Sequence, residues 1–332
     1  MSKRRRKGAI LLNAGADRME PDAEVHVADP HVWVALLHAE VAHLLGHAGI
    51  RVLHLKGPTV EHWLYDKGDR PSGDVDVLVA PDRMQDALDV LYEHGFVDRY
   101  PGVNRRTSTD HAIALRRLDP AIGLDEVDVH DRFEGFDRLA AEAFEVLWRH
   151  REPAQLAHQP VWFPDLPSRA ILLCLNAARD AAAPKPQEDL RRLLASDVEW
   201  DLVVALAGRL GALPALRAGL ELTDGGDELA NRLGLGPVSP EWQLRVSAAP
   251  RTALRLEELR RTPWPRRAPL VARWIIPAPA LVRMREPDLP PGWRPLTGAY
   301  ARRLGQGVRG LRSSVQAFRR ASAPRDGCLR GQ

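Results

Sequence analysis

The chain has 332 residues, of which 45% are hydrophobic and 27% are charged, with a formal net charge of +3. That length suits two domains of ordinary size, or one core with a large appendage. The composition matches soluble globular proteins and argues against a disordered chain. Two cysteines, Cys174 and Cys328, exclude a disulfide framework and a cysteine-rich zinc site, so we expect a reducing compartment and a cytoplasmic protein.

Residues 1–28 open on a basic run and show no periodicity, which predicts a flexible leader outside the core. The apolar stretch at residues 8–13 is too short for the hydrophobic part of a secretory signal, and Asp17 soon follows it. We therefore expect neither a signal peptide nor a membrane span.

Residues 29–135 alternate between helical and strand patterns. After the start signal at Asp29-Pro30, apolar residues recur at helical spacing over 31–47. Residues 50–55 and 74–79 have the pattern of short strands, and Pro58 suits the first turn of a helix between them. The expected elements continue as a helix at 81–94 ended by Gly95, a strand at 97–100, and a hairpin of 111–118 and 126–130 around an irregular loop.

Beyond residue 133 the strand signals fade, and helices are predicted at 139–150, 168–182, 189–194 and 200–210. From residue 239 onward, prolines are expected to break the chain into short pieces, with one basic helix at 300–320. The predicted fold class is α+β: a small mixed sheet with helices at 29–135, followed by a mostly helical C-terminal part. That part divides into a helical domain at 136–238 and an Arg-, Pro- and Trp-rich extension at 239–332.

The strand at 74–79 carries the first candidate site. Side chains at i and i+2 of a strand point the same way, so Asp74 and Asp76 share one face while Val75 and Val77 enter the core. Asp128 lies on a strand of the same period and is predicted to join them from a neighbouring strand.

Three carboxylates at one spot repel each other unless a cation lies between them, and a divalent ion with oxygen ligands is the usual solution. Such a site suits phosphoryl chemistry, because metal ions lower the pKa of a nucleophile and neutralise phosphate charge during in-line displacement. An isolated Asp-x-Asp is more often a solvated surface than a metal site, so its sequence context decides.

That context is a glycine turn, then Asp-x-Asp, then a third acid on a later strand, with Gly57, Asp74, Asp76 and Asp128 in this order. It resembles the polymerase-β-like nucleotidyltransferase superfamily. The segments 55–57, 70–79 and 127–130 look more narrowly like the family of uncharacterised nucleotidyltransferases, and the resemblance covers roughly residues 30–220.

The resemblance implies that Asp74, Asp76 and Asp128 are catalytic and bind Mg²⁺ or Mn²⁺, with Asp128 on the metal that activates the acceptor hydroxyl. It also implies that Gly57 lets the backbone approach the triphosphate of a nucleoside triphosphate (NTP) donor such as ATP. The chain departs from many superfamily members at Pro58, where a Ser or a second Gly would supply a hydroxyl or an amide to the phosphates.

Lys56, Gly57, Arg70 and Ser72 are the predicted nucleotide-binding residues, and three of them have plainer alternatives. Lys56 can instead extend from a strand end into solvent, and Arg70 can be an ion-pair partner of Asp74 or Asp76. Ser72 can serve only to shape the turn before the strand.

Histidines offer weaker candidates. His130 shares a face with Asp128, so it either approaches the site or makes a structural hydrogen bond, and the second interpretation is preferred. His111 is a less favoured candidate.

The predicted function is a metal-dependent transfer of a nucleoside monophosphate from an NTP to an acceptor: a small molecule, a peptide or protein, or RNA. One alternative is a catalytically inactive binding or regulatory protein with the same fold. The other is an RNA-directed transferase, because residues 251–332 carry 18 Arg against five acids. Trp264, Trp274 and Trp293 stand among these arginines, where core packing is preferred over stacking on bases.

Overall fold

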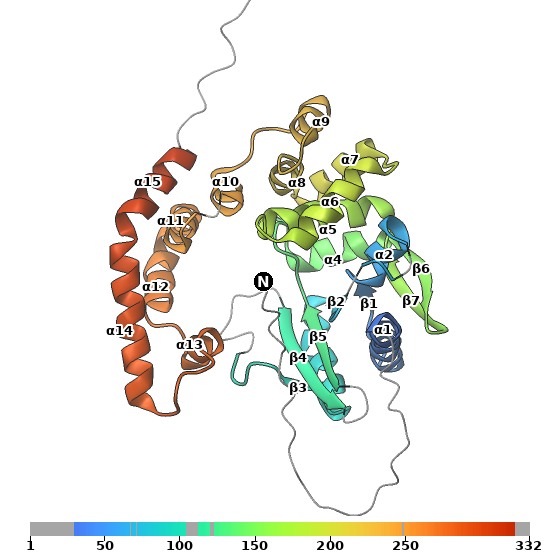
Figure 1. Ribbon diagram of the computed structural model, residues 1–332, viewed down its shortest axis with the longest axis horizontal. Coiled ribbons are helices and arrows are strands. Elements are labelled where there is room, and N and C mark those ends of the chain that lie inside the picture. The colour runs from blue at the N-terminus through green and yellow to red at the C-terminus, as the bar shows by residue number, and fades with distance from the viewer. Residues whose placement is uncertain are drawn as a thin grey trace, which may run out of the picture.

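The computed structural model describes residues 30–66, 68–70, 72–103, 112–119, 123–247 and 249–322. The predicted leader at 1–28, His111 and Cys328 lie outside these residues. Figure 1 shows a mixed sheet with its own helices, a group of helices beside it, and a further set of C-terminal helices. The predicted α+β class is confirmed. In the described part of the chain no helix combines the length and apolar character needed to cross a bilayer.

The main sheet has five strands in the order β1-β2-β5-β4-β3. Its members are β1 (Val52–His54), β2 (Val75–Val79), β3 (Val97–Asp98), β4 (Ala112–Asp119) and β5 (Gly123–His130). Strands β2 and β5 run parallel, and the other neighbours are antiparallel. The predicted hairpin is confirmed as β4–β5, and the parallel pair lies at the centre of the sheet.

One face of this sheet is apolar and packs against helices. Val75, Val77, Val127 and Val129 lie in one buried cluster with residues of α1 (Pro30–His47) and α3 (Met84–Glu93), which follows the short 3₁₀ helix η1 (Pro81–Arg83). Because side chains alternate along a strand, the residues between these valines point to the opposite face. Asp76 and Asp128 are therefore displayed there.

The four predicted helices of the second region are present. They are α4 (Ala140–Arg149), α5 (Leu166–Arg179), α6 (Pro184–Ala195) and α7 (Trp200–Leu210), and two more follow as α8 (Leu213–Leu220) and α9 (Gly226–Arg232). α5 lies at the centre, and most of its residues are buried. Its cluster also includes Leu53 and Leu78 of the sheet, so this region packs on the face that displays Asp76.

The expectation that strands end at residue 133 is wrong. β6 (Arg151–Leu156) and β7 (Gln159–Pro164) form an antiparallel hairpin. Its two-residue loop, Ala157-His158, has positive φ at both positions (45° and 65°), as tight hairpins require. The usual Asn-Gly or Asp-Gly signal is missing at this loop, so the sequence pattern did not reveal the hairpin.

The expectation of short pieces and one basic helix after residue 239 is also wrong. This part contains α10 (Pro240–Val246), α11 (Arg251–Arg261), α12 (Trp264–Ile275), α13 (Pro279–Arg285), α14 (Trp293–Arg309) and α15 (Leu311–Ser322). Several prolines lie at helix starts, where a missing amide costs nothing, instead of interrupting helices. The predicted helix at 300–320 is two helices that meet at Gly310.

Trp264 and Trp293 of this extension are not core residues as expected, whereas Trp274 is partly buried and Trp242 lies in the core. Trp264 and Trp293 are 79% and 69% exposed. The guanidinium carbon of a neighbouring arginine lies 5.4 Å from each ring centroid, Arg267 at Trp264 and Arg294 at Trp293. The extension therefore displays aromatic and cationic groups together on its surface.

A buried ion pair joins the turn before β2 to the helical region. Arg70 Nε and Nη2 donate to the two carboxylate oxygens of Asp189 on α6, at 2.8 and 2.7 Å. The hydroxyl of Tyr65 donates to the same carboxylate at 2.7 Å. The expected ion pair of Arg70 with Asp74 or Asp76 is thus wrong, because the acid that pairs with Arg70 comes from a helix distant in sequence.

A second buried polar pair lies between α1 and β1. The Nδ1 atoms of His38 and His54 are 2.7 Å apart, and both residues are fully buried. Burial lowers the pKa of His38 to about 4, although the charge of Asp76 acts in the opposite direction. Burial and the adjacent His38 also hold the pKa of His54 well below its ordinary value. Both rings are therefore neutral at pH 7.

The buried ion pair predicts a large loss of stability when one partner is removed. Asp189→Ala should lower the free energy of unfolding by about 3–5 kcal/mol, because it leaves the buried Arg70 charge without its carboxylate. The double variant Arg70→Met/Asp189→Ala should recover part of that loss. Urea unfolding measures both. Glu188→Ala, which removes an exposed acid of the same helix, is the control, and an equally small effect of both single substitutions would contradict the assignment.

The histidine pair predicts a stability loss in weak acid. Its folded pKa values lie below the unfolded value near 6.5, so the contribution is complete above pH 6.5 and declines as pH falls toward 4. The slope should approach about 1.4 kcal/mol per pH unit for each histidine. Urea midpoints at pH 7, 6 and 5 measure it. The double variant His38→Phe/His54→Phe should lose this decline, and an unchanged decline would refute the explanation.

Candidate active site

The parallel pairing of β2 and β5 builds the centre of the site. Asp76 lies directly opposite Asp128 in the register, and Leu78 lies opposite His130. Directly paired residues point to the same face, so Asp76, Asp128 and His130 project together. The predicted meeting of Asp76 and Asp128 from two neighbouring strands is therefore observed.

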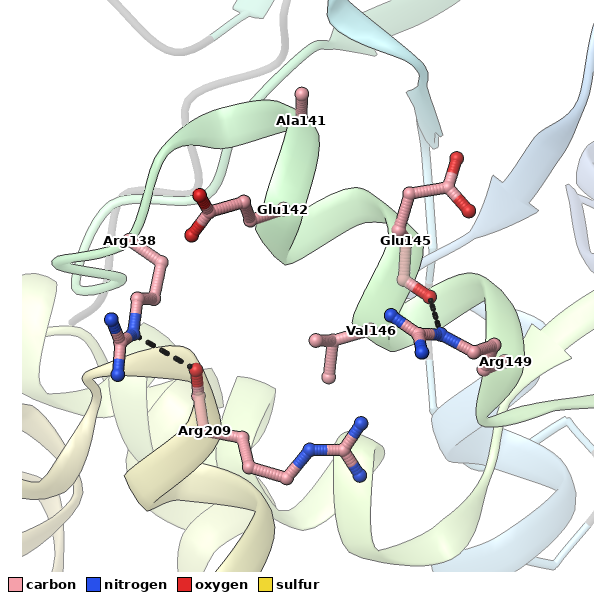
Figure 2. A pocket seen from close by; sticks show the side chains of 7 residues that line it. All are labelled: Arg138, Ala141, Glu142, Glu145, Val146, Arg149 and Arg209. Carbon is pink, nitrogen blue, oxygen red and sulfur yellow. Dashed lines mark hydrogen bonds between the residues drawn. The ribbon is translucent and has the colours of Figure 1, made fainter.

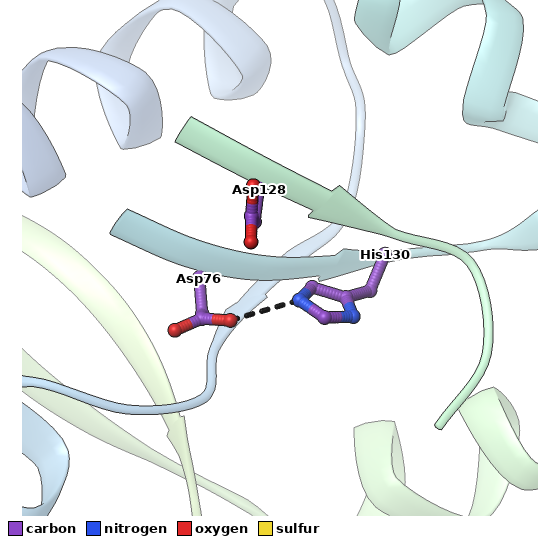
Figure 3. Close-up of side chains that lie close together, drawn as sticks. All are labelled: Asp76, Asp128 and His130. Carbon is purple, nitrogen blue, oxygen red and sulfur yellow. Dashed lines mark hydrogen bonds and ion pairs between the residues drawn. The ribbon is translucent and has the colours of Figure 1, made fainter. Parts of the chain in front are cut away.

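These three side chains form a compact group, shown in Figure 3. One ligand atom from each lies within 4.8 Å of the others. Asp76 and His130 are buried and Asp128 is partly buried. Among the described residues this is the group of acids and histidines close enough to hold one ion, and its two carboxylates suit divalent cations such as Mg²⁺ or Mn²⁺.

Asp76 is a buried anion with two partners on one oxygen. Its side chain is 3% exposed, and its Oδ1 accepts from Lys56 Nζ at 2.7 Å and lies 2.9 Å from His130 Nε2. Burial alone would raise the pKa of Asp76, but Lys56 and His130 outweigh it and hold the pKa well below its usual range. The carboxylate is thus ionised and fixed in direction before any ligand binds.

Asp128 has the opposite electrostatic character. Burial raises the pKa of Asp128, and the negative charges of Asp76 and Asp74 raise it further. A partly exposed carboxylate with a raised pKa is a better proton acceptor than an ordinary one. The two paired aspartates thus have pKa values shifted in opposite directions.

Asp74 stands apart from this group. It lies at a bend immediately before β2, is partly buried, and contributes no atom to the group of three. Its charge still acts on Asp128. Its predicted role as a metal ligand stays a prediction. The third member of the group is His130, whereas the sequence pattern suggested Asp74.

The turn at Gly57 is the other predicted part of the site. Gly57 has φ 65° and ψ −116°, a conformation that other residues rarely adopt. A Cβ at this position would lie 3.0 Å from Ser72 Oγ and 3.3 Å from His38 Nε2. Ser72 Oγ itself lies 3.5 Å from the carbonyl oxygen of Asp74, so Ser72 packs between the turn and the strand.

The helix after this turn offers few donors to a phosphate. The carbonyl of Gly57 accepts from the amides of Val60 and Glu61, both at 3.1 Å, and Pro58 has no amide. Arg70 Nη1 also donates to this carbonyl, at 3.4 Å. Since α2 (Pro58–Leu64) is only seven residues long, nearby cations are better placed than its first turn to bind phosphate.

Lys185 is a cation of the site that sequence reasoning missed. It lies in the first turn of α6, and the residue as a whole is exposed. Partial desolvation of its ammonium and the positive charge of Arg70 lower the pKa of Lys185, whereas Asp74, Asp189 and Asp76 act in the opposite direction. Its ammonium therefore lies within electrostatic reach of the aspartates, although no local sequence pattern marks it.

A hollow of about 600 Å³ lies elsewhere, between α4 and α7. Figure 2 shows its arginines and glutamates around an open surface. Arg138 donates to the carbonyl of Arg209 and Arg149 to that of Glu145, so both are already used within the fold. It shares no lining residue with the acidic group, and we assign it no chemistry.

Comparison with known proteins agrees with this geometry. The family model described as uncharacterised nucleotidyltransferase matches residues 31–224. No curated protein matches the chain. Among solved structures, an antigenic nucleotidyltransferase-like protein from Paracoccidioides brasiliensis is 15% identical with a TM-score of 0.37, over 63% of this chain and 94% of that one.

The solution structure of the antibiotic-resistance factor ANT(2'')-Ia is also 15% identical, with a TM-score of 0.36, over 55% of this chain and 96% of that one. The family match spans more than half of the chain and includes every residue of the acidic group. The chain belongs to the family of uncharacterised nucleotidyltransferases.

Proposed function

We propose that the protein transfers a nucleoside monophosphate from an NTP to a hydroxyl of an acceptor. The acceptor oxygen bonds to the α-phosphorus, the bond between that phosphorus and the oxygen bridging to the β-phosphate breaks, and pyrophosphate leaves. The hydroxyl proton passes to a base of the protein. The observation that carries this proposal is the paired placement of Asp76 and Asp128 on adjacent parallel strands, in a chain of nucleotidyltransferase family.

Each side chain of the site has a proposed role. Asp76 and Asp128, with Asp74 at the edge, hold Mg²⁺ or Mn²⁺, and His130 fixes the orientation of Asp76. When bound, the ion supplies neutralisation of the triphosphate charge and polarises the reacting oxygens. Asp128, the more exposed of the two paired aspartates, accepts the hydroxyl proton.

Cations of this chain complete the nucleotide site. Lys56 donates to Asp76 and lies next to the Gly57 turn. Its ammonium can therefore leave the Asp76 carboxylate and bind a phosphate oxygen of the nucleotide instead. Lys185 supplies a second ammonium from α6. Arg70 is occupied by Asp189 and is proposed to hold the Gly57 turn in place through its carbonyl. ATP is the first donor to test, and the proposed setting is the cytoplasm.

An inactive binding protein is the second candidate, and one observation favours it. The ammonium of Lys56 lies 2.7 Å from the same Asp76 oxygen that would face a metal ion. If this ion pair is permanent, it replaces the metal. Calorimetric titration with MgCl₂ and MnCl₂ separates the two candidates, because only the enzyme should show binding that Asp76→Asn abolishes.

Substitution of the aspartates tests the catalytic proposal. Asp76→Asn and Asp128→Asn should each reduce Mg²⁺-dependent pyrophosphate release by roughly 10²-fold or more, because each removes a metal ligand and Asp128→Asn also removes the base. Labelled pyrophosphate released from γ-labelled ATP, GTP, CTP and UTP is measured with a deproteinised metabolite extract as acceptor source.

Glu126→Gln is the matched control, because Glu126 lies on the same strand and face as Asp128 but pairs with Arg99. Its activity should equal that of the unaltered protein. Activity that survives in both aspartate variants would contradict the proposal.

Gly57→Ala tests the turn. An alanine at φ 65° and ψ −116° is strained and also crowds Ser72, so the turn must shift and the variant should bind ATP at least about ten-fold more weakly. Gly234→Ala is the matched control, because Gly234 has φ 66° with no atom near the added Cβ. Gly234→Ala should lose less stability because nothing crowds its added Cβ, and equal ATP binding by the two variants would show that the Gly57 turn is not part of the nucleotide site.

A further inference from the structure

A separate small hollow opens beside Asp128. It has a volume of about 220 Å³, and its walls include Asp128, Ala112, Ala114, Tyr100, Arg179 and Met284. Ligand sites for drug-sized molecules usually occupy about 300–1,000 Å³. The hollow therefore suits a smaller compound.

The strand register explains why there is room here. On β4, Ala114 lies opposite Asp128 and Ala112 lies opposite His130. Paired residues point to the same face, so two small side chains lie next to the acidic group. The carboxylate of Asp128 thus borders an open space on the side away from β2.

The C-terminal extension closes this space. Met284 belongs to α13, which packs against the sheet edge: a Cβ added to Gly102 would lie 3.2 Å from Ala280 Cβ. A methionine side chain is flexible and adapts to varied ligand shapes. Together with Tyr100, it forms the apolar wall of the hollow.

The lining of the hollow also includes a cation with spare hydrogen-bonding capacity. Arg179 Nη1 is buried, and no described residue accepts a hydrogen bond from it. Its nearest acid, Glu134, lies 3.5 Å from Nε and is bound more closely by Arg245, at 2.6 Å. A buried guanidinium nitrogen without an acceptor is costly, and an anionic group is the partner it prefers.

We propose that this hollow receives the acceptor, and that the acceptor is a small hydroxylated anion. Its hydroxyl faces Asp128, and its carboxylate or phosphate group binds Arg179. This inference rests on the proposed nucleotidyl transfer. The reaction then joins the acceptor oxygen to the α-phosphorus, releases pyrophosphate and passes the hydroxyl proton to a base of the protein. A positively charged acceptor is disfavoured, because it would place a second cation against Arg179.

Four probes with one scaffold test the charge preference. They are 4-(hydroxymethyl)benzoate, 4-(hydroxymethyl)phenyl phosphate, benzyl alcohol and 4-(hydroxymethyl)benzylamine. Binding to the full chain, without metal or NTP, is measured by ligand-observed NMR. At least one anionic probe should bind ten-fold or more tightly than benzyl alcohol, and the amine should bind most weakly. The two anionic arms distinguish a carboxylate from a phosphate acceptor.

Variants assign the binding to this hollow. Arg179→Gln should reduce the affinity for the preferred anion to within about two-fold of the affinity for benzyl alcohol, whereas Arg179→Lys should keep part of the preference for the anion. Ala114→Leu should weaken all probes at least ten-fold with ATP binding unchanged. Ala141→Leu, the same substitution beside the hollow of Figure 2, should change nothing. Thermal unfolding checks that each variant is folded.

Several results would overturn the inference. One is that neither anionic probe binds, and another is that the neutral or cationic probe binds as tightly as the anions. The inference also fails if Arg179→Gln keeps the same preference for the anion, or if single-stranded RNA displaces the preferred anion. Failure of the proposed function looks different: the probes follow the expected order, but Mg²⁺ and ATP never yield a nucleotidylated probe.

Discussion

The buried carboxylate of Asp76 is the interaction on which the rest of the site depends. An ionised acid in a nearly closed environment costs several kcal/mol unless it is paired and hydrogen-bonded. Lys56 and His130 provide that compensation on one oxygen, and both are brought there by the sheet, Lys56 just after β1 and His130 at the end of β5. The negative charge that the fold must stabilise is therefore the charge that the proposed metal ion would bind.

Three parts of the chain meet around this carboxylate. The sheet supplies Asp76 and Asp128, and α6 supplies Lys185 and the Asp189 carboxylate that holds Arg70. The C-terminal extension supplies Met284 beside Asp128. Because Arg70 also donates to the carbonyl of Gly57, the position of α6 is coupled to the turn expected to meet the nucleotide. The helical parts thus shape the site as well as cover the sheet.

Much of this architecture is encoded locally. The alternation of Asp76 with buried valines, and of Asp128 with its own, predicts two carboxylates on one face, because strand periodicity needs only neighbouring residues. The partner of Arg70, the contribution of Lys185 and the cation at Arg179 depend on residues far apart in the chain, so no local pattern reveals them. The helices after residue 239 were missed because a proline at a helix start and a proline inside a helix look alike in sequence. The β6–β7 hairpin was missed because Ala157-His158 is an unusual loop sequence.

The central claim is that Asp76 and Asp128 form one divalent-cation site beside the Gly57 turn. Anomalous scattering from crystals of the full chain grown with MnCl₂ and a non-hydrolysable ATP analogue tests it most directly. The account predicts a manganese peak in contact with the carboxylates of both Asp76 and Asp128, with Lys56 moved from Asp76 toward a phosphate. Lys56 still bound to Asp76, with manganese absent or bound elsewhere, would contradict it.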